Sequence, residues 1–148
     1  MAYKSKGLNT LTDLFYSQRF AVLSTQKDGQ PYASLVAFSF NPELTRLFFL
    51  TARKTRKYET LLACDRVAVL VHSAANQAED FEDAISVTAL GRAVTVEDKT
   101  RPVRDFLDRH PGLADFARDP DTAMVAVIPE TYLLVSRFRD VEKIIMGP

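Results

Sequence analysis

Residues 20–51 read FAVLSTQKDGQPYASLVAFSFNPELTRLFFLT, which is three apolar runs separated by two turns. The first turn contains Asp28-Gly29, a pair that suits a tight hairpin because it supplies the positive φ such a turn requires. The second turn contains Asn41-Pro42-Glu43. We therefore predict an antiparallel meander of three strands. Its strands cover residues 20–25, 31–40 and 46–51.

Short helices and further strands are predicted outside this meander. Apolar side chains at helical spacing predict helices over residues 9–17, 54–63 and 99–109. Apolar runs predict strands over residues 67–71, 84–96, 122–128 and 131–137, with 141–146 as an additional candidate. Gly91 is expected at a bulge, Pro129 is expected to divide the two strands beside it, and residues 74–83 are expected to form an acidic loop. The fold class predicted is mainly β with short helices, in which six to seven strands form one antiparallel split barrel.

Length and composition narrow the class of protein. A chain of 148 residues, 47% of them hydrophobic, is long enough for its own core, and we expect one domain over residues 1–148. Equal numbers of basic and acidic residues, 19 of each, argue against a protein dedicated to nucleic acids. No apolar run is long enough for a membrane span. Cys64 is the single cysteine and cannot form an internal disulfide, so a cytoplasmic location is expected.

The zero net charge conceals an uneven distribution. Residues 1–75 contain ten Lys/Arg and five Asp/Glu, whereas residues 76–148 contain nine and fourteen. The halves therefore differ by ten charges, +5 against −5, which is also what complementary surfaces within one domain would give. Positive charge is densest in Arg53-Lys54-Thr55-Arg56-Lys57.

This basic cluster follows the predicted strand that ends at Thr51 and opens the predicted helix over 54–63. The start of a helix attracts anions because its N–H groups are free and its dipole is positive there. Cations at that position oppose the dipole, so their presence favours a bound phosphate. Thr51 and Thr55 would add hydroxyl donors, Arg56 a forked contact and Lys57 a point charge. The alternatives are a solvated basic turn or, more weakly, a contact to nucleic acid.

These residues carry a family resemblance. Gln30-Pro31-Tyr32, Leu50-Thr51 and Thr55-Arg56-Lys57 stand in the order and spacing of the flavin-binding split-barrel family that includes pyridoxamine 5′-phosphate oxidases. The resemblance implies a homodimer with FMN at the subunit interface, and the deazaflavin F420 and haem are the alternative cofactors. It further implies that Thr51, Thr55, Arg56 and Lys57 bind the phosphate with Arg53 outside them. The remaining implied site residues, beneath the flavin ring, are Ser34, Leu35 and Val36.

The chain also departs from the vitamin-B6 enzymes of this family. Ser34 and Ser39 stand near positions where those enzymes have Arg and Lys, the chain has no tryptophan, and the C-terminal Arg-x-His pattern is missing. The expected function is therefore an FMN-dependent oxidoreductase acting on an unidentified small molecule. The alternative is a non-catalytic protein that binds or senses flavin or haem.

No residue is identified as catalytic, and no metal site is predicted. His72 and His110 lack Cys or carboxylate partners at ligand spacing, so both are interpreted as structural. Cys64 is interpreted as a packed thiol. The acidic residues 79–83 are interpreted as a solvated loop, with a cover over the flavin or a dimer contact as alternatives. The segment Arg137-Phe138-Arg139 is interpreted as surface, with a contact to the partner's flavin as the alternative.

Overall fold

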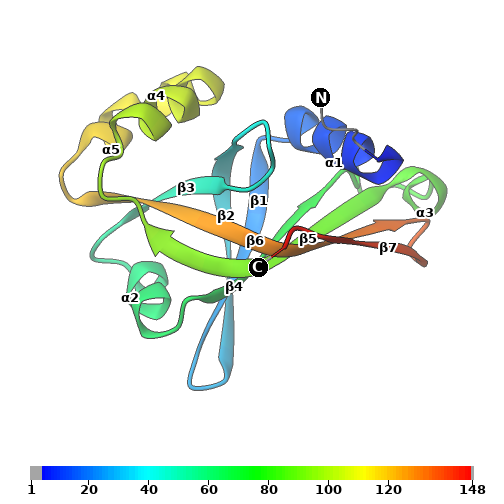
Figure 1. Ribbon diagram of the computed structural model, residues 1–148, viewed down its shortest axis with the longest axis horizontal. Helices are drawn as coiled ribbons and strands as arrows, with labels where there is room; N and C mark the ends of the chain where they lie inside the picture. The colour runs from blue at the N-terminus through cyan, green and yellow to red at the C-terminus, as the bar shows by residue number, and fades with distance from the viewer. Residues whose placement is uncertain (1–4, 148) are drawn as a thin grey trace.

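The structure, a computed structural model, describes residues 5–147. It contains seven strands and five short α-helices (Figure 1). The strands are β1 Phe20–Lys27, β2 Gln30–Phe40, β3 Leu47–Ala52, β4 Arg66–His72, β5 Ile85–Thr95, β6 Thr122–Ser136 and β7 Asp140–Ile145. The helices are α1 Lys6–Ser17, α2 Arg56–Ala63, α3 Asp80–Asp83, α4 Thr100–Arg109 and α5 Ala114–Arg118, with a 3₁₀ turn at Pro111–Leu113. None of these helices has both the length and the apolar character needed to cross a bilayer.

Six of the strands close into an antiparallel barrel, and β7 extends it. The strand order is β3-β2-β1-β4-β5-β6, and β3 pairs with the first half of β6 to close the ring. The second half of β6 pairs with β7 instead. The predicted meander β1–β2–β3 is confirmed, as is the mainly β barrel with six strands and one additional strand.

The prediction that Pro129 divides two strands is wrong, because β6 runs unbroken from Thr122 to Ser136. Opposite β5, Leu90 pairs with Thr131 and Gly91 pairs with Pro129, so Glu130 is an extra residue in β6. A proline is tolerated inside a sheet at such a bulge because the ladder is interrupted there. Gly91, predicted at a bulge, lies at this irregularity, and a Cβ at this position would collide with the backbone carbonyl of Ile128.

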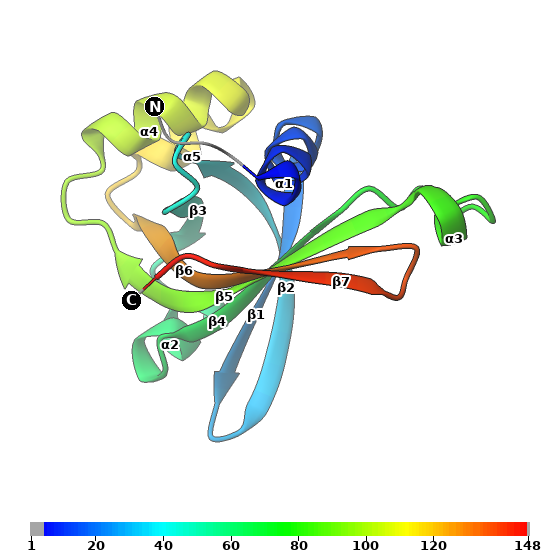
Figure 2. The same ribbon diagram turned by 45° about the vertical axis from the view of Figure 1, so that its right-hand side comes forward.

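Two apolar clusters hold the barrel and its helices together. The first cluster fills the barrel and includes Phe15 from α1 and Tyr58 from α2. The helices α1 and α2 lie on opposite sides of the barrel (Figure 2). The second lies outside the barrel, where α4 and α5 cover β3 and the start of β6. Its buried members are Leu50, Val103, Phe106, Ala117 and Met124.

Two other expectations about the ends of elements need correction. The first helix begins at Lys6 rather than residue 9, because Ser5 caps it by accepting the Leu8 N–H at 3.2 Å. Residues 74–83 are not entirely loop, since α3 forms one turn within them. The additional candidate strand at 141–146 is confirmed as β7.

The end of α4 is fastened to the barrel by two adjacent side chains. Arg109 donates to the backbone carbonyls of Phe15 and Gln18, at 3.2 and 2.6 Å, where α1 ends. His110 is buried, and its Nε2 lies 2.7 Å from the carbonyl oxygen of Phe38. The structural role predicted for His110 at a helix end is confirmed.

Candidate functional site

The start of α2 supplies unpaired backbone donors. Thr55 is the N-cap, with extended backbone angles and its Oγ1 accepting the Tyr58 N–H at 3.2 Å. The N–H groups of Arg56 and Lys57 have no acceptor within residues 5–147. A helix start with two such N–H groups carries the partial positive charge that attracts an anion.

A pocket of about 370 Å³ lies beside this helix start, between β2, the end of β3 and the α4–α5 segment. We call it the α2 pocket. Its polar lining is Thr51, Thr55 and Lys57. The larger apolar residues that line it include Phe20, Leu35, Phe106, Leu113 and Phe116, and Val36 contributes as well. The structure thus brings together five of the predicted site residues, which are Leu35, Val36, Thr51, Thr55 and Lys57.

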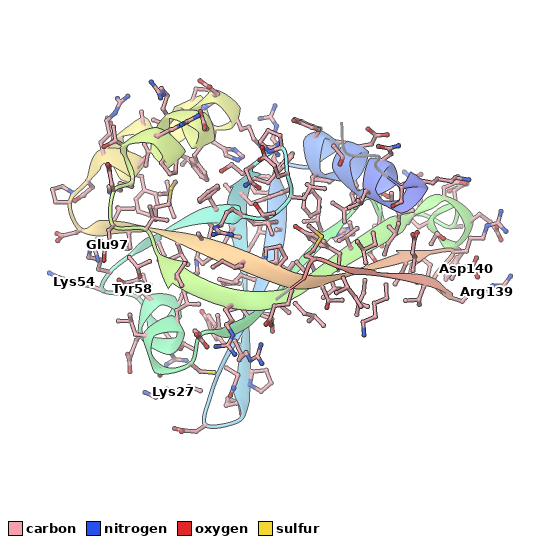
Figure 3. The ribbon with its side chains drawn as sticks, viewed as in Figure 1. Lys27, Lys54, Tyr58, Glu97, Arg139 and Asp140 are labelled. Carbon is pink, nitrogen blue, oxygen red and sulfur yellow. The ribbon has the colours of Figure 1, made fainter. Side chains whose placement is uncertain are left out.

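Lys57 is the cation of this pocket. It is half-buried, and burial lowers the pKa of its amine, because desolvation disfavours the charged form. No carboxylate within residues 5–147 forms an ion pair with it. By contrast, the nearby Lys54 is exposed and extends away from the start of α2 (Figure 3). An anion in the α2 pocket would restore a partner for the Lys57 charge.

The two threonine hydroxyls are already engaged in the protein. Their Oγ1 atoms lie 3.0 Å apart, and Thr55 Oγ1 donates to the Ala52 carbonyl oxygen at 2.9 Å. Each hydroxyl has a single proton. The predicted donation from Thr51 and Thr55 to a ligand would therefore require these bonds to break. In this geometry the donors left for an anion are the α2 amides and the Lys57 amine.

Three predicted site residues do not line the α2 pocket. Arg53 donates to the Tyr58 hydroxyl at 3.2 Å and to the Pro120 carbonyl oxygen at 3.4 Å, so it links α2 to the segment before β6. Arg56 is exposed and lines a separate polar pocket against the β1–β2 hairpin. The Ser34 Oγ is buried and has no hydrogen-bond partner among residues 5–147. Their roles toward a ligand stay predictions.

Sequence reasoning missed the aromatic residues of the α2 pocket. Phe106 and Phe116 come from α4 and α5, and Phe20 comes from the first residue of β1. No local pattern could place residues of α4 and α5 at the same pocket as the start of α2. The exposure of Phe20 and Leu35, 56% and 67%, shows apolar surface at the pocket that the chain itself does not cover.

The closed six-stranded antiparallel barrel with short helices defines the fold class of this chain. The chain belongs to the pyridoxamine 5′-phosphate oxidase family, whose model matches residues 9–136. The likeness drawn from residues 30–57 is thereby confirmed at the level of the family. Among curated protein sequences, none matches this chain.

Solved structures share this fold at low sequence identity. General Stress Protein 26 from Bacillus anthracis is 20% identical, with a TM-score of 0.73, over 93% of this chain and 97% of that chain. An FAD-binding protein from Mesorhizobium loti is 19% identical, with a TM-score of 0.70, over 85% and 90% of the two chains. A haem-binding protein from Mycobacterium smegmatis is 14% identical, with a TM-score of 0.83, over 97% of this chain and 60% of that chain. These likenesses show the fold, and the ligands named for the last two proteins differ.

Proposed function

We propose that this chain binds FMN in the α2 pocket and works as an oxidoreductase on a small molecule. The observation that carries the proposal is Lys57, whose desolvated amine has no carboxylate partner among residues 5–147, at the start of α2 and in the lining of a largely apolar pocket. A phosphate group suits the polar end, since it would accept from the amides and offset the Lys57 charge. A planar ring suits the apolar end.

The apolar end of the α2 pocket is lined by both aliphatic and aromatic side chains. Leu35 and Val36 come from strand β2, and Phe20 and Phe116 add aromatic faces. Such side chains exclude water from a ring and fix its plane. Together with the membership of the family, this lining supports a flavin as the ring.

Bound FMN would supply the hydride or electron transfer, and the chain's residues would hold and orient it. Lys57 is the only side chain among those lining the α2 pocket that ionises at ordinary pH. The lining therefore offers binding and exclusion of water rather than acid–base chemistry. A haem would need a His, Cys, Met or Tyr ligand to its iron, and none of these types lines the pocket.

We also propose that a second copy of the chain covers the outer face of the sheet. Two cross-strand rows on this face consist of uncharged residues across β2, β1, β4, β5 and β6, and the first of them continues on β7 to Lys143. One row is Leu35, Val22, Leu70, Thr88 and Leu133, and the other is Ala33, Ser24, Ala68, Leu90, Thr131 and Ile145. The first row ends at Leu35, which also lines the α2 pocket, so a partner on this face would lie next to the flavin.

The test is FMN binding by wild-type protein and by two matched lysine variants. We expect Lys57→Met to weaken FMN binding at least about tenfold, because a charge-assisted contact to phosphate is lost. Lys54→Met should bind as the wild type does, since Lys54 does not line the pocket. Riboflavin, which lacks the phosphate, should bind both variants and the wild type alike. Equal loss of FMN affinity in both variants, or no FMN binding by the wild type, would contradict the proposal.

Turnover separates the oxidoreductase from a protein that only stores or senses flavin. We expect the FMN-loaded protein to oxidise NADH or NADPH with reduction of its flavin, followed by reoxidation by an added acceptor. Tight FMN binding with no steady-state rate for any donor would favour the non-catalytic alternative.

A further inference from the structure

A second pocket lies at the end of the molecule opposite the α2 pocket. It is about 320 Å³ in volume and is formed where β4 ends, β5 begins and β6 ends. We call it the His72 pocket. Figure 2 shows α3 and the β6–β7 turn on the far side of the barrel from α2, α4 and α5. The residues that matter here are His72, Ser86, Val135 and Phe138, which all line it.

Strand register builds one face of this pocket. His72 pairs with Ser86 across β4 and β5, and Ser86 pairs with Val135 across β5 and β6. Side chains directly opposite each other in a sheet leave it on the same face. His72, Ser86 and Val135 therefore form a single row, in which two polar side chains stand beside apolar ones.

Phe138 forms the opposite wall and is held there by an unfavourable turn. Arg139 N–H donates to the Ser136 carbonyl oxygen at 3.2 Å, and the two residues between them, Arg137 and Phe138, have φ of 53° and 59°. Turns with two left-handed residues favour Asn-Gly, because a Cβ is strained in that region. Arg137 and Phe138 therefore adopt a backbone conformation that their side chains disfavour. Core packing does not account for it, because Phe138 is exposed.

The same aromatic side chain is exposed and paired with another exposed one. Phe138 is 63% exposed and Phe81 is 67% exposed, and their ring centroids lie 5.4 Å apart. Arg137 and Glu82 connect the same two segments with an ion pair at 3.9 Å. The contact between the two rings holds Phe138 at the mouth of the His72 pocket without burying it, and the solvent-exposed Arg137–Glu82 pair contributes little to its position.

The polar groups of the pocket are hydrogen-bond donors. Nδ1 of His72 accepts the Ala74 N–H at 3.1 Å, so the neutral ring has its proton on Nε2. His72 is exposed and Ser86 is half-buried, and neither His72 Nε2 nor the Ser86 hydroxyl has a protein partner within the described part of the chain. The lining contains no Lys, Arg, Asp or Glu.

We propose that the His72 pocket binds an uncharged planar ring compound whose carbonyl oxygen accepts hydrogen bonds from His72 and Ser86. The ring would lie against Phe138 and Val135. A pocket of this size, largely apolar with a few polar groups, is typical of small-molecule sites. The two pockets share no residue, so the proposal does not depend on FMN binding. Leu70 lines the His72 pocket and also lies in a row of the outer face, so a second copy on that face would lie beside this pocket.

Coumarin, an uncharged fused-ring carbonyl compound, is the probe, and its binding is measured by calorimetry on the full chain with FMN present. We expect Phe138→Gly to weaken coumarin binding at least tenfold. Arg137→Gly is the matched control, because it relieves the same turn but leaves the wall in place, so its affinity should equal that of the wild type. Both variants should be at least as stable to heat as the wild type, since glycine tolerates a positive φ. His72→Leu should weaken binding several-fold while keeping the pocket apolar.

Four outcomes would overturn the proposal. Equal binding by Phe138→Gly and Arg137→Gly would show that the wall plays no part. Equal binding of coumarin-3-carboxylate would contradict an uncharged ligand. Displacement of coumarin by FMN would place the ring in the α2 pocket instead. Loss of self-association in Phe138→Gly, without loss of coumarin affinity, would make Phe138 a contact between copies. FMN titration of the same variants tests the proposed function separately.

Discussion

Lys57 holds a positive charge in surroundings that give it no carboxylate partner among the described residues. A half-buried ammonium without a partner lowers the stability of the folded chain, because part of its hydration is lost. A binding site tolerates such a residue when the ligand supplies the missing charge. Binding of a phosphate should therefore raise the pKa of Lys57 back toward its ordinary value.

His110 gives a prediction for the dependence of stability on pH. Burial lowers the pKa of its imidazole below the ordinary value of 6.5, outweighing the hydrogen bond to the Phe38 carbonyl, which acts to raise it; Arg109 and Arg19 add to the lowering. The unfolded chain therefore binds a proton at His110 before the folded chain does as pH falls. Its contribution to stability is present above about pH 6.5 and is lost progressively as pH falls below that value.

The measurement is the free energy of unfolding in urea at about pH 7.5 and about pH 5.5, for wild type and His110→Gln. We expect the wild type to lose more stability between the two values, because glutamine does not titrate. The carboxylates and His72 are common to both proteins and cancel in the comparison. An equal loss in both proteins would show that His110 titrates alike in the folded and unfolded chains.

At the scale of single residues, the sequence predicted which types gather near a site but not which way each side chain points. Lys57 and Thr55 could be placed at a helix start, because capping and charge act within a few positions. Arg53 could not be placed, since one of its acceptors is the Pro120 carbonyl oxygen, 67 positions away. The same applies to Arg56, whose position against the β1–β2 hairpin depends on how α2 packs on the barrel.

Gly91 gives a prediction at the scale of one element. We expect Gly91→Ala to lower the free energy of unfolding by about 1–3 kcal/mol, because its Cβ would meet backbone atoms of β6 rather than a side chain that can move. Gly112→Ala is the matched control, since nothing lies within 4 Å of a Cβ at that position. Urea denaturation of both variants checks the expectation. Two variants of equal stability would mean that β6 shifts freely at its bulge.

The positions of strands and turns were predicted correctly where a short sequence pattern was sufficient to determine them. The Asp28-Gly29 turn and the strands on either side of it are found as expected, with Asp28 and Gly29 both at positive φ. The division at Pro129 failed, because whether a proline ends a strand or sits in a bulge depends on the partner strand. The start of α1 failed for a local reason, since Ser5 caps the helix ahead of its apolar stripe.

The whole molecule gives a prediction about self-association. Leu90 is 41% exposed in the row of the outer face that contains no charged residue. We expect Leu90→Lys to weaken self-association at least about tenfold, because a charge would be buried without a partner. Leu62→Lys is the control, since Leu62 is exposed on α2 and outside that row. Sedimentation velocity checks both, and a monomeric wild type would contradict the covered face.

The basic and acidic segments of the sequence are also separated in the folded molecule. The basic residues 53–57 lie at α2, and the acidic residues 79–83 lie at α3, on the opposite side of the molecule (Figure 1). Composition could predict the imbalance but not this separation, which depends on barrel closure. The apolar residues that α4 and α5 bring to the α2 pocket were unpredictable for the same reason.

Closure of the barrel also has a consequence for synthesis of the chain. Strand β3 ends at Ala52, but the partner that covers its free edge, β6, begins only at Thr122. Pairing between segments so distant in sequence forms slowly. A growing chain therefore presents an open edge of β3 throughout the time that residues 53–121 are being made. Such an edge can pair with other chains, so folding on the ribosome should be the stage most prone to aggregation.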